Sequence, residues 1–507
     1  MGLTMTKRSQ DITLGIVGAG AMGRGIAQIA AQAGCRVLLL DAREGAAAEA
    51  KTALEKQWGK LVDKGRMTAE AAAAAGERLT IVAGARDLAA ANVVVEAIVE
   101  QLDAKRALFK ELDDIVSADC VLATNTSSLS VTRIAAGTAN PGRVAGFHFF
   151  NPVPLMKVVE VVAGALTESS PLDLLAALAA EWGHTPVRAQ DTPGFIVNHA
   201  GRGYVTEALA LLREGVADVA TIDTLLRDAA GFRLGPFELL DLTGLDVSQP
   251  VMESIYHQYY EDPRYRPSPI AAQRLAAGLL GRKSGRGFYR YDGQPNPEPP
   301  ASTAAPWRGP VWVSDAQPEA ATATRQLLQR LGATIEGSAR PSEAALIVVT
   351  PLGTDVSDCV AAEGLDARRT VGVDTLLPLD RRRTLMGSPA SDAAIAAQAQ
   401  ALFAGDGVPA SLIADSAGFV VQRVLASIVN IGCEIAQQGI CSPTDLDLAV
   451  TLGLGYPQGP LAWGDALGAR RILAVLTALQ ARTGDMRYRP SLWLVRRAQL
   501  AMSLRQR

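Results

Sequence analysis

The chain has 507 residues, which at roughly 100–200 residues per domain predicts about three or four domains. A hydrophobic fraction of 48% and a charged fraction of 20% exclude an intrinsically disordered protein. Lys and Arg number 49 and Asp and Glu number 52, and the resulting net charge of −3 argues against binding of nucleic acid or a membrane surface through overall charge. Five cysteines without CxxC spacing predict a reducing compartment, with neither a disulfide framework nor a zinc cluster.

Targeting and membrane segments are also absent from the sequence pattern. No apolar run reaches the roughly 18 residues that span a bilayer, and the first ten residues lack the apolar core of a signal peptide. We therefore expect a soluble, cytoplasmic protein with no membrane partner.

The first expected element in chain order is a strand over the apolar residues 12–17. The sequence GAGAMG follows at 18–23 and opens a helical stretch, and a second apolar run at 37–40 ends at Asp41. Strand, glycine turn, helix, strand and acid in this order predict a dinucleotide-binding unit. Strands alternating with helices predict an α/β domain with a mostly parallel sheet over residues 1–187. The further expected strands are 92–98, 120–124, 144–149 and 158–162.

The glycine turn predicts how a dinucleotide would be held. Gly18 permits the tight turn, Gly20 lets the backbone approach a pyrophosphate, and Gly23 lets the helix pack on the strand. The start of that helix offers free N–H groups to phosphate. Asp41 is placed to bind the ribose hydroxyls and to repel a 2′-phosphate, which favours NAD over NADP. Arg43, two residues further on, would weaken that preference.

Beyond the α/β domain the hydrophobic period becomes that of amphipathic helices. Residues 188–290 therefore predict an all-helical domain. The proline-rich residues 291–307 lack apolar periodicity and predict a linker.

Three segments of the helical domain recur in the second half in the same order. The matched segments are 191–215 with 415–439, 235–244 with 459–468, and the pentapeptide RYRPS at 264–268 with 487–491. The first two matches share an offset of 224 residues. We conclude that residues 411–507 are a duplicate of the helical domain.

The segment 308–410 again alternates strands and helices and is predicted to be a degenerate Rossmann-like domain. Its first strand, VWVS at 311–314, is not followed by the glycine pattern. Without that turn the backbone cannot approach a pyrophosphate closely, so we expect a single nucleotide site, in the N-terminal half.

His148 and Glu160 are the strongest catalytic candidates. A single histidine is more often structural than catalytic, but His148 ends a strand of the nucleotide-binding sheet, where ligands gather. Glu160 lies on the next apolar strand, where a buried carboxylate is costly unless paired. The small polar residues 124–130 could supply hydroxyl donors at the same sheet edge. The other histidines, His184, His199 and His257, are assigned structural or surface roles.

These motifs resemble the 3-hydroxyacyl-CoA dehydrogenase family. The matching pieces are VGAGAMG, VVEAIVE, NTSSLS, FHFFNPVPLMKVVEVV, DTPGFIVN, GPFELLDLTGLD and GRKSGRGFY, in family order across residues 12–290. The duplicated second half resembles the long form of the family, which is associated with oxidation of 3-hydroxyadipyl-CoA in phenylacetate degradation. The resemblance implies a Rossmann-like domain followed by a helical domain, NAD as the cofactor and an acyl-CoA as the substrate.

The resemblance also implies roles for four residues. His148 would be the base that takes the proton of the substrate's 3-hydroxyl group, and Glu160 would orient its imidazole. Ser127 and Asn198 match residues that hold the 3-oxygen and the thioester carbonyl. From the residues alone, Ser127 could equally be a helix N-cap and Asn198 a hydrogen-bonded amide inside a helix.

Further contacts come from the same resemblance. The cofactor-binding residues are Gly18, Gly20, Met22, Gly23, Asp41, Glu100, Lys105 and Asn125. The substrate-binding residues are Ser127, Asn151, Asn198 and Lys64. Lys64 falls where the family has a lysine near the CoA phosphates, and a solvated lysine on a helix face is an equal alternative.

The second half keeps the sequence patterns that predict the fold but lacks the residues proposed for catalysis. Asn198 becomes Gln422, and residues 371–374 contain an aspartate where the first half has its histidine. Because the helical domain is the dimer surface in the family, we expect residues 415–507 to pack against 191–290 as an internal pseudo-dimer. A homo-oligomer is the alternative.

Two other interpretations remain open at this point. The same catalytic residues suit a short-chain 3-hydroxybutyryl-CoA dehydrogenase, and a catalytically silent NAD-binding structural protein is a third interpretation. A dicarboxylic acyl chain needs a cation at its far end, for which Arg202 and Arg233 are candidates; both could equally be solvated surface arginines.

Overall fold

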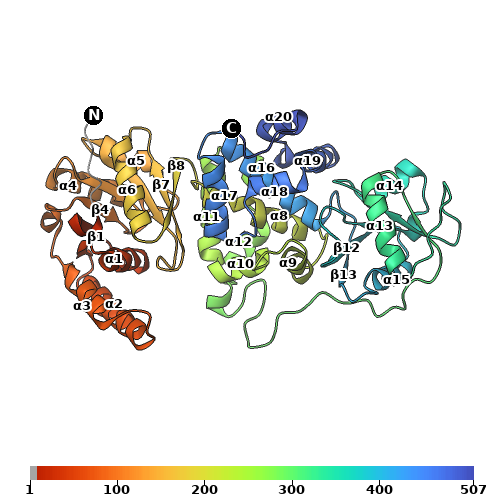
Figure 1. The fold of residues 1–507 in the computed structure, drawn as a ribbon, viewed down its shortest axis with the longest axis horizontal. Coiled ribbons are helices and arrows are strands. Elements are labelled where there is room, and N and C mark those ends of the chain that lie inside the picture. Colours follow the sequence, from red (N-terminus) through yellow and green to blue (C-terminus); the bar gives the residue numbers. More distant parts are fainter. Residues whose placement is uncertain (1–7) are drawn as a thin grey trace. The chain divides into compact units, whose positions relative to one another are not determined.

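The computed structural model describes residues 8–507, so most of the N-terminal segment used for the signal-peptide expectation lies outside it. The chain forms two compact units, drawn in Figure 1. Unit 1 contains the chain through His199 together with residues 438–454, and unit 2 contains 200–437 and 455–507. Within the described residues, none of the helices combines the length and apolarity needed to cross a membrane.

Unit 1 is built on a mixed sheet. In its described residues, eight strands follow the order β3-β2-β1-β4-β5-β6-β7-β8, and only β6 and β7 run antiparallel. The strands are β1 (Thr13–Val17), β2 (Arg36–Leu40), β3 (Leu79–Ile81), β4 (Val93–Glu96), β5 (Val121–Thr124), β6 (Val144–Phe149), β7 (Val158–Ala163) and β8 (Thr185–Gln190). The predicted Rossmann-like sheet is confirmed. Sequence reasoning missed β3, which exposes two of its three residues, and gave no bounds for β8, an edge strand that contains a proline.

Helices cover this sheet and complete its core. They are α1 (Ala21–Ala33), α2 (Ala46–Asp63), α3 (Ala69–Arg78), α4 (Leu102–Ile115), α5 (Val131–Ala135), α6 (Ser169–Glu181), α7 (Val197–Ala200) and α17 (Pro443–Leu454). The core joins Trp58 of α2 to Phe147 and Phe149 of β6 and to Trp182. Since alternate residues of a strand point to opposite faces, the burial of Phe147 and Phe149 leaves His148 on the other face of β6.

Unit 2 contains a smaller sheet. Its described strands have the order β13-β12-β11-β10-β9, with β11 and β12 antiparallel and the other neighbours parallel. They are β9 (Val311–Val313), β10 (Leu346–Val349), β11 (Thr370–Val373), β12 (Arg383–Gly387) and β13 (Ala410–Ile413). This order and direction repeat those of β4 to β8 in unit 1. We therefore correct one expectation: strand 311–314 matches β4 rather than β1, so this sheet has no counterpart of β1 to β3 among its described strands, and the glycine turn is missing together with the strands that flank it.

The helical part of unit 2 places related segments against each other. Helix α8 (Arg202–Arg213) packs along α16 (Val420–Gln437). The two backbones approach closely at Gly203, where a Cβ atom would lie 2.9 Å from Cα of Ile428. The other helices of this unit are α9 (Val219–Asp228), α10 (Pro236–Thr243), α11 (Leu245–Gln258), α12 (Pro269–Ala276), α13 (Pro318–Arg330), α14 (Val356–Glu363), α15 (Ala393–Phe403), α18 (Pro460–Leu467), α19 (Ala469–Thr483) and α20 (Leu492–Leu500).

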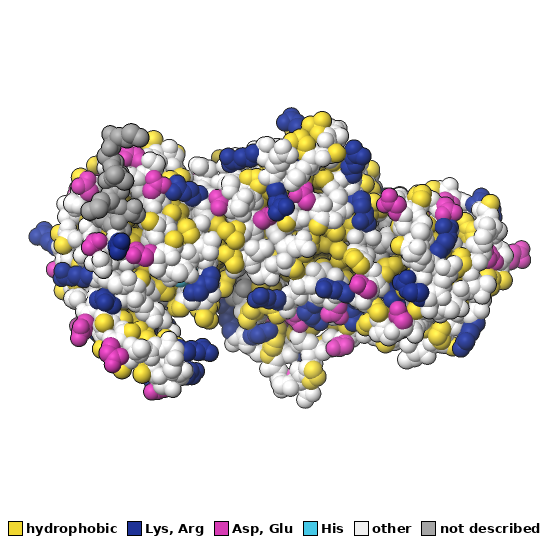
Figure 2. All heavy atoms as spheres, in the orientation of Figure 1, with side chains coloured by type: hydrophobic (Ala, Val, Ile, Leu, Met, Phe, Trp, Pro, Cys, Tyr) yellow, Lys and Arg dark blue, Asp and Glu magenta, His cyan; other side chains and the backbone are white. Residues whose placement is uncertain are grey.

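Two further segments of the second half have a defined place. Residues 438–454, which include α17, belong to the compact unit of the N-terminal sheet and not to the unit that contains the rest of 411–507. Residues 294–307, most of the expected linker, have no helix or strand. Figure 2 shows basic and acidic side chains interspersed over the face drawn, in keeping with the net charge of −3.

Candidate active site

His148 and Glu160 form a buried pair at the centre of the candidate site. The antiparallel register of β6 and β7 places the two residues directly opposite each other. Nδ1 of His148 lies 2.6 Å from Oε2 of Glu160. His148 is 4% exposed and Glu160 is fully buried. Because the carboxylate accepts the Nδ1 proton, the neutral imidazole carries a lone pair on Nε2, which has no hydrogen-bond partner among residues 8–507.

A tight turn holds the second oxygen of Glu160. Oε1 accepts hydrogen bonds from the backbone N–H groups of Ile196 and Val197, both at 2.9 Å. The turn that directs these groups has left-handed backbone at Gly194 (φ 78°) and at Phe195 (φ 48°). A left-handed phenylalanine is uncommon, so packing around Phe195 must hold the turn. Its ring lies 5.7 Å from the imidazole of His148, centroid to centroid.

Ser127 and Asn198 meet beside this pair. Ser127 lies in the loop after β5, and its carbonyl oxygen accepts a hydrogen bond of 3.3 Å from Nδ2 of Asn198, which lies in α7. The alternative that Ser127 caps a helix is wrong, because α5 begins at Val131 and its N-cap is Ser130.

A buried ionic network supports the same loop. Nζ of Lys105 lies 2.5 Å from Oε1 of Glu96 and 3.2 Å from Oε2 of Glu100, and the Lys105 side chain is 1% exposed. Glu100 also accepts hydrogen bonds from the Thr126 hydroxyl and the Ser127 N–H group. Burial would raise the pKa of Glu100, but Lys105 and these hydrogen bonds outweigh it and hold that pKa below its usual value.

The family resemblance implied that Glu100 and Lys105 contact the cofactor, which stays a prediction. Glu96, fully buried at the end of β4, was not among the predicted residues. The available signal was a glutamate that closes a run of three valines, since a buried carboxylate requires a partner.

The glycine turn leaves room for a diphosphate. A Cβ atom at Gly20 would meet no atom within 4 Å, so the space in front of the first turn of α1 is open. By contrast, a Cβ atom would lie 2.4 Å from the Ala97 oxygen at Gly18 and 1.8 Å from the Gly18 oxygen at Gly23. Gly18 and Gly23 are therefore required because a side chain would collide with the backbone, and Gly20 because a side chain would occupy the open space before the helix. This arrangement fits the pyrophosphate of NAD.

Asp41 directly follows β2, and its carboxylate can accept further hydrogen bonds. Its Oδ2 accepts the Ala19 N–H at 2.7 Å and its Oδ1 accepts the Arg43 N–H at 2.8 Å. Each carboxylate oxygen has a second lone pair with which to accept a ribose hydroxyl. The Arg43 side chain forms two hydrogen bonds with Glu49, at 3.1 and 2.6 Å, and so is directed to Glu49.

The remaining predicted residues are more dispersed. Asn125 Oδ1 accepts the Phe149 N–H at 2.9 Å and ties the ends of β5 and β6 together. Met22 is half-buried on α1 against the core. Lys64 and Asn151 are exposed, and within residues 8–507 neither side chain forms a hydrogen bond or an ion pair.

The other histidines lie where structural roles are expected. Both ring nitrogens of buried His184 face backbone carbonyl oxygens, of Val153 at 2.9 Å and of Trp182 at 3.2 Å. His199 is fully buried in α7. His257 is exposed and lies 2.9 Å from Glu261.

Two models of known protein families match this chain. The model described as "3-hydroxyacyl-CoA dehydrogenase, NAD binding domain" matches residues 13–192. The model described as "3-hydroxyacyl-CoA dehydrogenase, C-terminal domain" matches two segments, 194–291 and 418–503.

Two curated relatives differ in how much of the chain they cover. The chain is 37% identical to the 3-hydroxyadipyl-CoA dehydrogenase of Escherichia coli over 492 residues, which is 96% of this chain and 98% of that protein. It is 41% identical to a probable 3-hydroxybutyryl-CoA dehydrogenase of Deinococcus radiodurans over 277 residues, which is 55% of this chain and 99% of the relative.

Two solved structures differ in the same way in the share of this chain that they cover. A crystal structure titled 3-hydroxybutyryl-CoA dehydrogenase from Escherichia coli has a TM-score of 0.84 at 35% identity and covers 96% of this chain and 98% of its own. The (S)-3-hydroxybutyryl-CoA dehydrogenase of Ralstonia eutropha has a TM-score of 0.54 at 38% identity and covers 55% of this chain and 99% of its own. With an NAD-binding domain and a C-terminal domain of one family, and a relative matched over nearly its full length, the chain belongs to the 3-hydroxyacyl-CoA dehydrogenase family.

Proposed function

We propose that the chain oxidises the 3-hydroxyl group of a (3S)-3-hydroxyacyl-CoA to a 3-oxo group, with NAD as the oxidant. The observation that carries the proposal is the buried His148–Glu160 pair, with 2.6 Å between Nδ1 and Oε2 and with Nε2 left without a protein partner among the described residues. This is the arrangement of a general base oriented by a carboxylate.

In this mechanism Nε2 of His148 takes the proton of the substrate hydroxyl as the carbon–oxygen double bond forms. Bound NAD would supply the acceptor for the hydride that leaves C3. The imidazolium so formed is stabilised by Glu160, whose own position is fixed by the N–H groups of Ile196 and Val197. Charge therefore develops where the protein already holds a compensating carboxylate.

Substrate positioning is the role proposed for the neighbouring polar residues. The Ser127 hydroxyl and the Asn198 amide are offered to the 3-oxygen and the thioester carbonyl. The hydrogen bond from Nδ2 of Asn198 to the backbone carbonyl oxygen of Ser127 fixes the spacing of the loop and the helix. Lys64 and Asn151, both exposed, are offered to the CoA portion of the substrate.

Cofactor choice gives a first test. We expect Asp41→Ala to raise the KM for NAD about 10–100-fold, because a hydrogen bond to a charged group contributes about 1.5–3 kcal/mol. The measurement is the initial rate as a function of NAD concentration. Arg43→Ala is the control, with a change below about threefold, since the exposed pair with Glu49 contributes little. An unchanged KM in Asp41→Ala would remove Asp41 from the cofactor site.

As substrate we propose 3-hydroxyadipyl-CoA. This agrees with the resemblance of the duplicated second half to the form of the family that is associated with phenylacetate degradation. The support is the Escherichia coli relative with that name, which matches this chain over nearly its full length. The second candidate is 3-hydroxybutyryl-CoA, because the solved structure of matching length has that name in its title. A distal carboxylate needs a cation; the two candidates from the sequence, Arg202 and Arg233, both lie in unit 2. Arg233 is exposed, and burial lowers the pKa of Arg202 to about 10.

Comparing the two substrates separates these candidates. We expect kcat/KM to be at least about tenfold higher for 3-hydroxyadipyl-CoA, because a site built for a carboxylate is left with an unpaired cation by the shorter chain. The ratio is measured with both thioesters at saturating NAD. A ratio below one assigns the enzyme to short-chain substrates.

We also propose that the second half is a duplicate without catalytic function. One family model matches both halves, and Asp191 and Asp415, 224 residues apart, each accept the first N–H of a helix: Asp191 from Val131 at 3.0 Å and Asp415 from Val356 at 2.9 Å. In the second half Gln422 donates a hydrogen bond of 3.0 Å to Asp374. The second half thus has an amide bonded to a carboxylate where the first half has an imidazole paired with a carboxylate.

The two halves are proposed to form an internal pseudo-dimer in the helical part of unit 2. The recurring RYRPS segments make reciprocal contacts: Nη2 of Arg264 donates to the Arg489 oxygen at 3.2 Å, and Nη2 of Arg487 donates to the Arg266 oxygen at 3.5 Å. Arg266 and Arg489 are each ion-paired with an aspartate of the other repeat. An enzyme with this internal pair does not need a second subunit for the contact. We propose a cytoplasmic location for the enzyme, because its cysteine usage predicts a reducing compartment.

A further inference from the structure

A segment of the second half packs on the catalytic sheet. Helix α17 contacts both β7 and β8. Its side chains at Pro443, Leu446, Ala449 and Val450 are buried. Just before the helix, the Ile440 oxygen accepts a hydrogen bond of 2.8 Å from the N–H group of Gln190 at the end of β8. This segment is therefore a fixed part of unit 1.

The last turn of α17 reaches the two segments that hold Glu160. A Cβ atom at Gly453 would lie 3.0 Å from Cγ2 of Val197 and 3.3 Å from Cγ1 of Val158. Val197 donates its N–H to Glu160, and Val158 precedes Glu160 by two residues on β7. The space at Gly453 is thus filled to its limit by the residues that position the carboxylate.

Unit 2 repeats this contact with the halves exchanged. There the N–H group of Ala414 donates to the Val216 oxygen at 3.0 Å. Ala414 and Gln190 are 224 residues apart, as are Ile440 and Val216. In each unit, the edge strand of the sheet is hydrogen-bonded to a segment from the other half of the chain. Because the equivalent contact occurs in both units, we regard the contact of α17 with the first sheet as a regular feature of this fold.

We propose that α17 is a positioning element for the His148–Glu160 pair, and that Gly453 is the residue through which it acts. The inference rests on the proposed function. Without a side chain at Gly453, Val197 can take the position in which its N–H group meets Glu160. A side chain there must push Val197 and Val158 away, since an interatomic distance near 3.0 Å leaves no free space. The catalytically silent half thereby contributes to catalysis in the active half.

The test uses a graded series in the full-length chain. Gly453→Ala and Gly453→Val are expected to lower kcat by about 3-fold and by about 10–100-fold, with the KM for NAD unchanged, because misplacing a catalytic group by a fraction of an ångström costs rate and not cofactor binding. Thr444→Val, an exposed position on the same helix, is the matched control and keeps the wild-type kcat. Adding Val197→Ala to Gly453→Val should restore kcat to within about threefold of wild type, because it removes the methyl groups that collide.

A spectroscopic measurement keeps this inference separate from the proposed function. The downfield proton resonance of Nδ1–H of His148, assigned by its loss in His148→Gln, should shift in Gly453→Val and return in the double variant, whether or not any thioester is turned over. A wild-type kcat and an unmoved resonance in Gly453→Val would overturn the positioning role. So would a loss that Val197→Ala fails to rescue. Failure of the wild-type chain to oxidise any 3-hydroxyacyl-CoA would instead overturn the proposed function.

Discussion

Replacing His148 by Gln is expected to lower kcat by about 10²–10⁴-fold, while NADH still binds. A glutamine can keep a hydrogen bond to Glu160 but cannot take the substrate proton, so the variant loses general-base catalysis and little else. The measurement is the steady-state rate of oxidation of a (3S)-3-hydroxyacyl-CoA, together with NADH binding by fluorescence titration. Because the imidazole is 4% exposed and shares its Nδ1 proton with a buried carboxylate, bulk buffer is a poor substitute for it.

His257→Gln is the matched control for this variant. His257 is an exposed histidine on α11 whose Nδ1 lies 2.9 Å from Oε1 of Glu261, and we expect its replacement to change kcat by less than about twofold. Retention of near wild-type turnover by His148→Gln would overturn the assignment of the base. Loss of NADH binding in that variant would point instead to a disturbed cofactor site.

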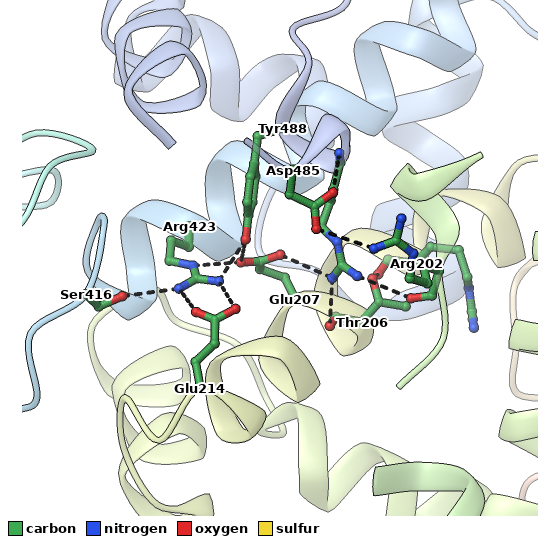
Figure 3. Close-up of polar contacts among 10 residues, drawn as sticks. Arg202, Thr206, Glu207, Glu214, Ser416, Arg423, Asp485 and Tyr488 are labelled. Atoms are coloured by element: carbon green, nitrogen blue, oxygen red, sulfur yellow. Dashed lines mark hydrogen bonds and ion pairs between the residues drawn. The ribbon is translucent and has the colours of Figure 1, made fainter. Parts of the chain in front are cut away.

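The largest effect on stability is expected from Glu207→Ala, at about 3–5 kcal/mol of unfolding free energy. Figure 3 shows the cluster in unit 2, where Nε of Arg423 lies 2.7 Å from Oε1 of Glu207. Both side chains are 1% exposed. The Tyr488 hydroxyl donates to the same carboxylate oxygen at 2.8 Å. Among the described residues, removing this carboxylate leaves the buried guanidinium with the partly exposed Glu214 as its one carboxylate partner.

Burial alone would lower the pKa of Arg423, but Glu207 and the neighbouring Tyr488 and Glu214 hold it above its usual range. A guanidinium stays protonated in proteins. The cation is therefore retained when Glu207 is lost, and the cost is large because the buried charge has lost its buried partner. Urea-induced unfolding followed by circular dichroism measures it. Glu214→Ala, at a side chain that is 38% exposed, should cost no more than about 1 kcal/mol. Combining Glu207→Ala with Arg423→Met should recover part of the loss, because an apolar side chain needs no partner. A cost below about 1 kcal/mol for Glu207→Ala would show that water reaches Arg423 in this cluster.

The candidate site could be predicted from sequence because its parts lie on strongly patterned elements. The apolar runs around His148 and Glu160 predicted two buried strands, and the carboxylate on the second strand implied a partner for it. The glycine turn and Asp41 followed from local spacing alone. The family resemblance then added Ser127 and Asn198, whose mutual hydrogen bond spans 71 residues of sequence and has no local signature.

Other features depend on contacts that no local pattern encodes. Helix α17 is apolar on more than one side, so its sequence predicts burial but not against which sheet. The match of the second sheet to β4–β8 rests on the antiparallel pairing of β11 with β12, a register set by tertiary packing. Glu96 escaped notice because its partner Lys105 lies in the next helix, where a lysine normally indicates a solvated face.

The most direct test of the central claim is the fate of the hydrogen on C3 of the substrate. With (3S)-3-hydroxyadipyl-CoA deuterated at C3 and NAD, the wild-type chain is predicted to form NADH that carries the deuterium, detected by mass spectrometry, and His148→Gln to form it at least about 10²-fold more slowly. NADH formed without the deuterium, or deuterium transfer at the wild-type rate in His148→Gln, would contradict the account.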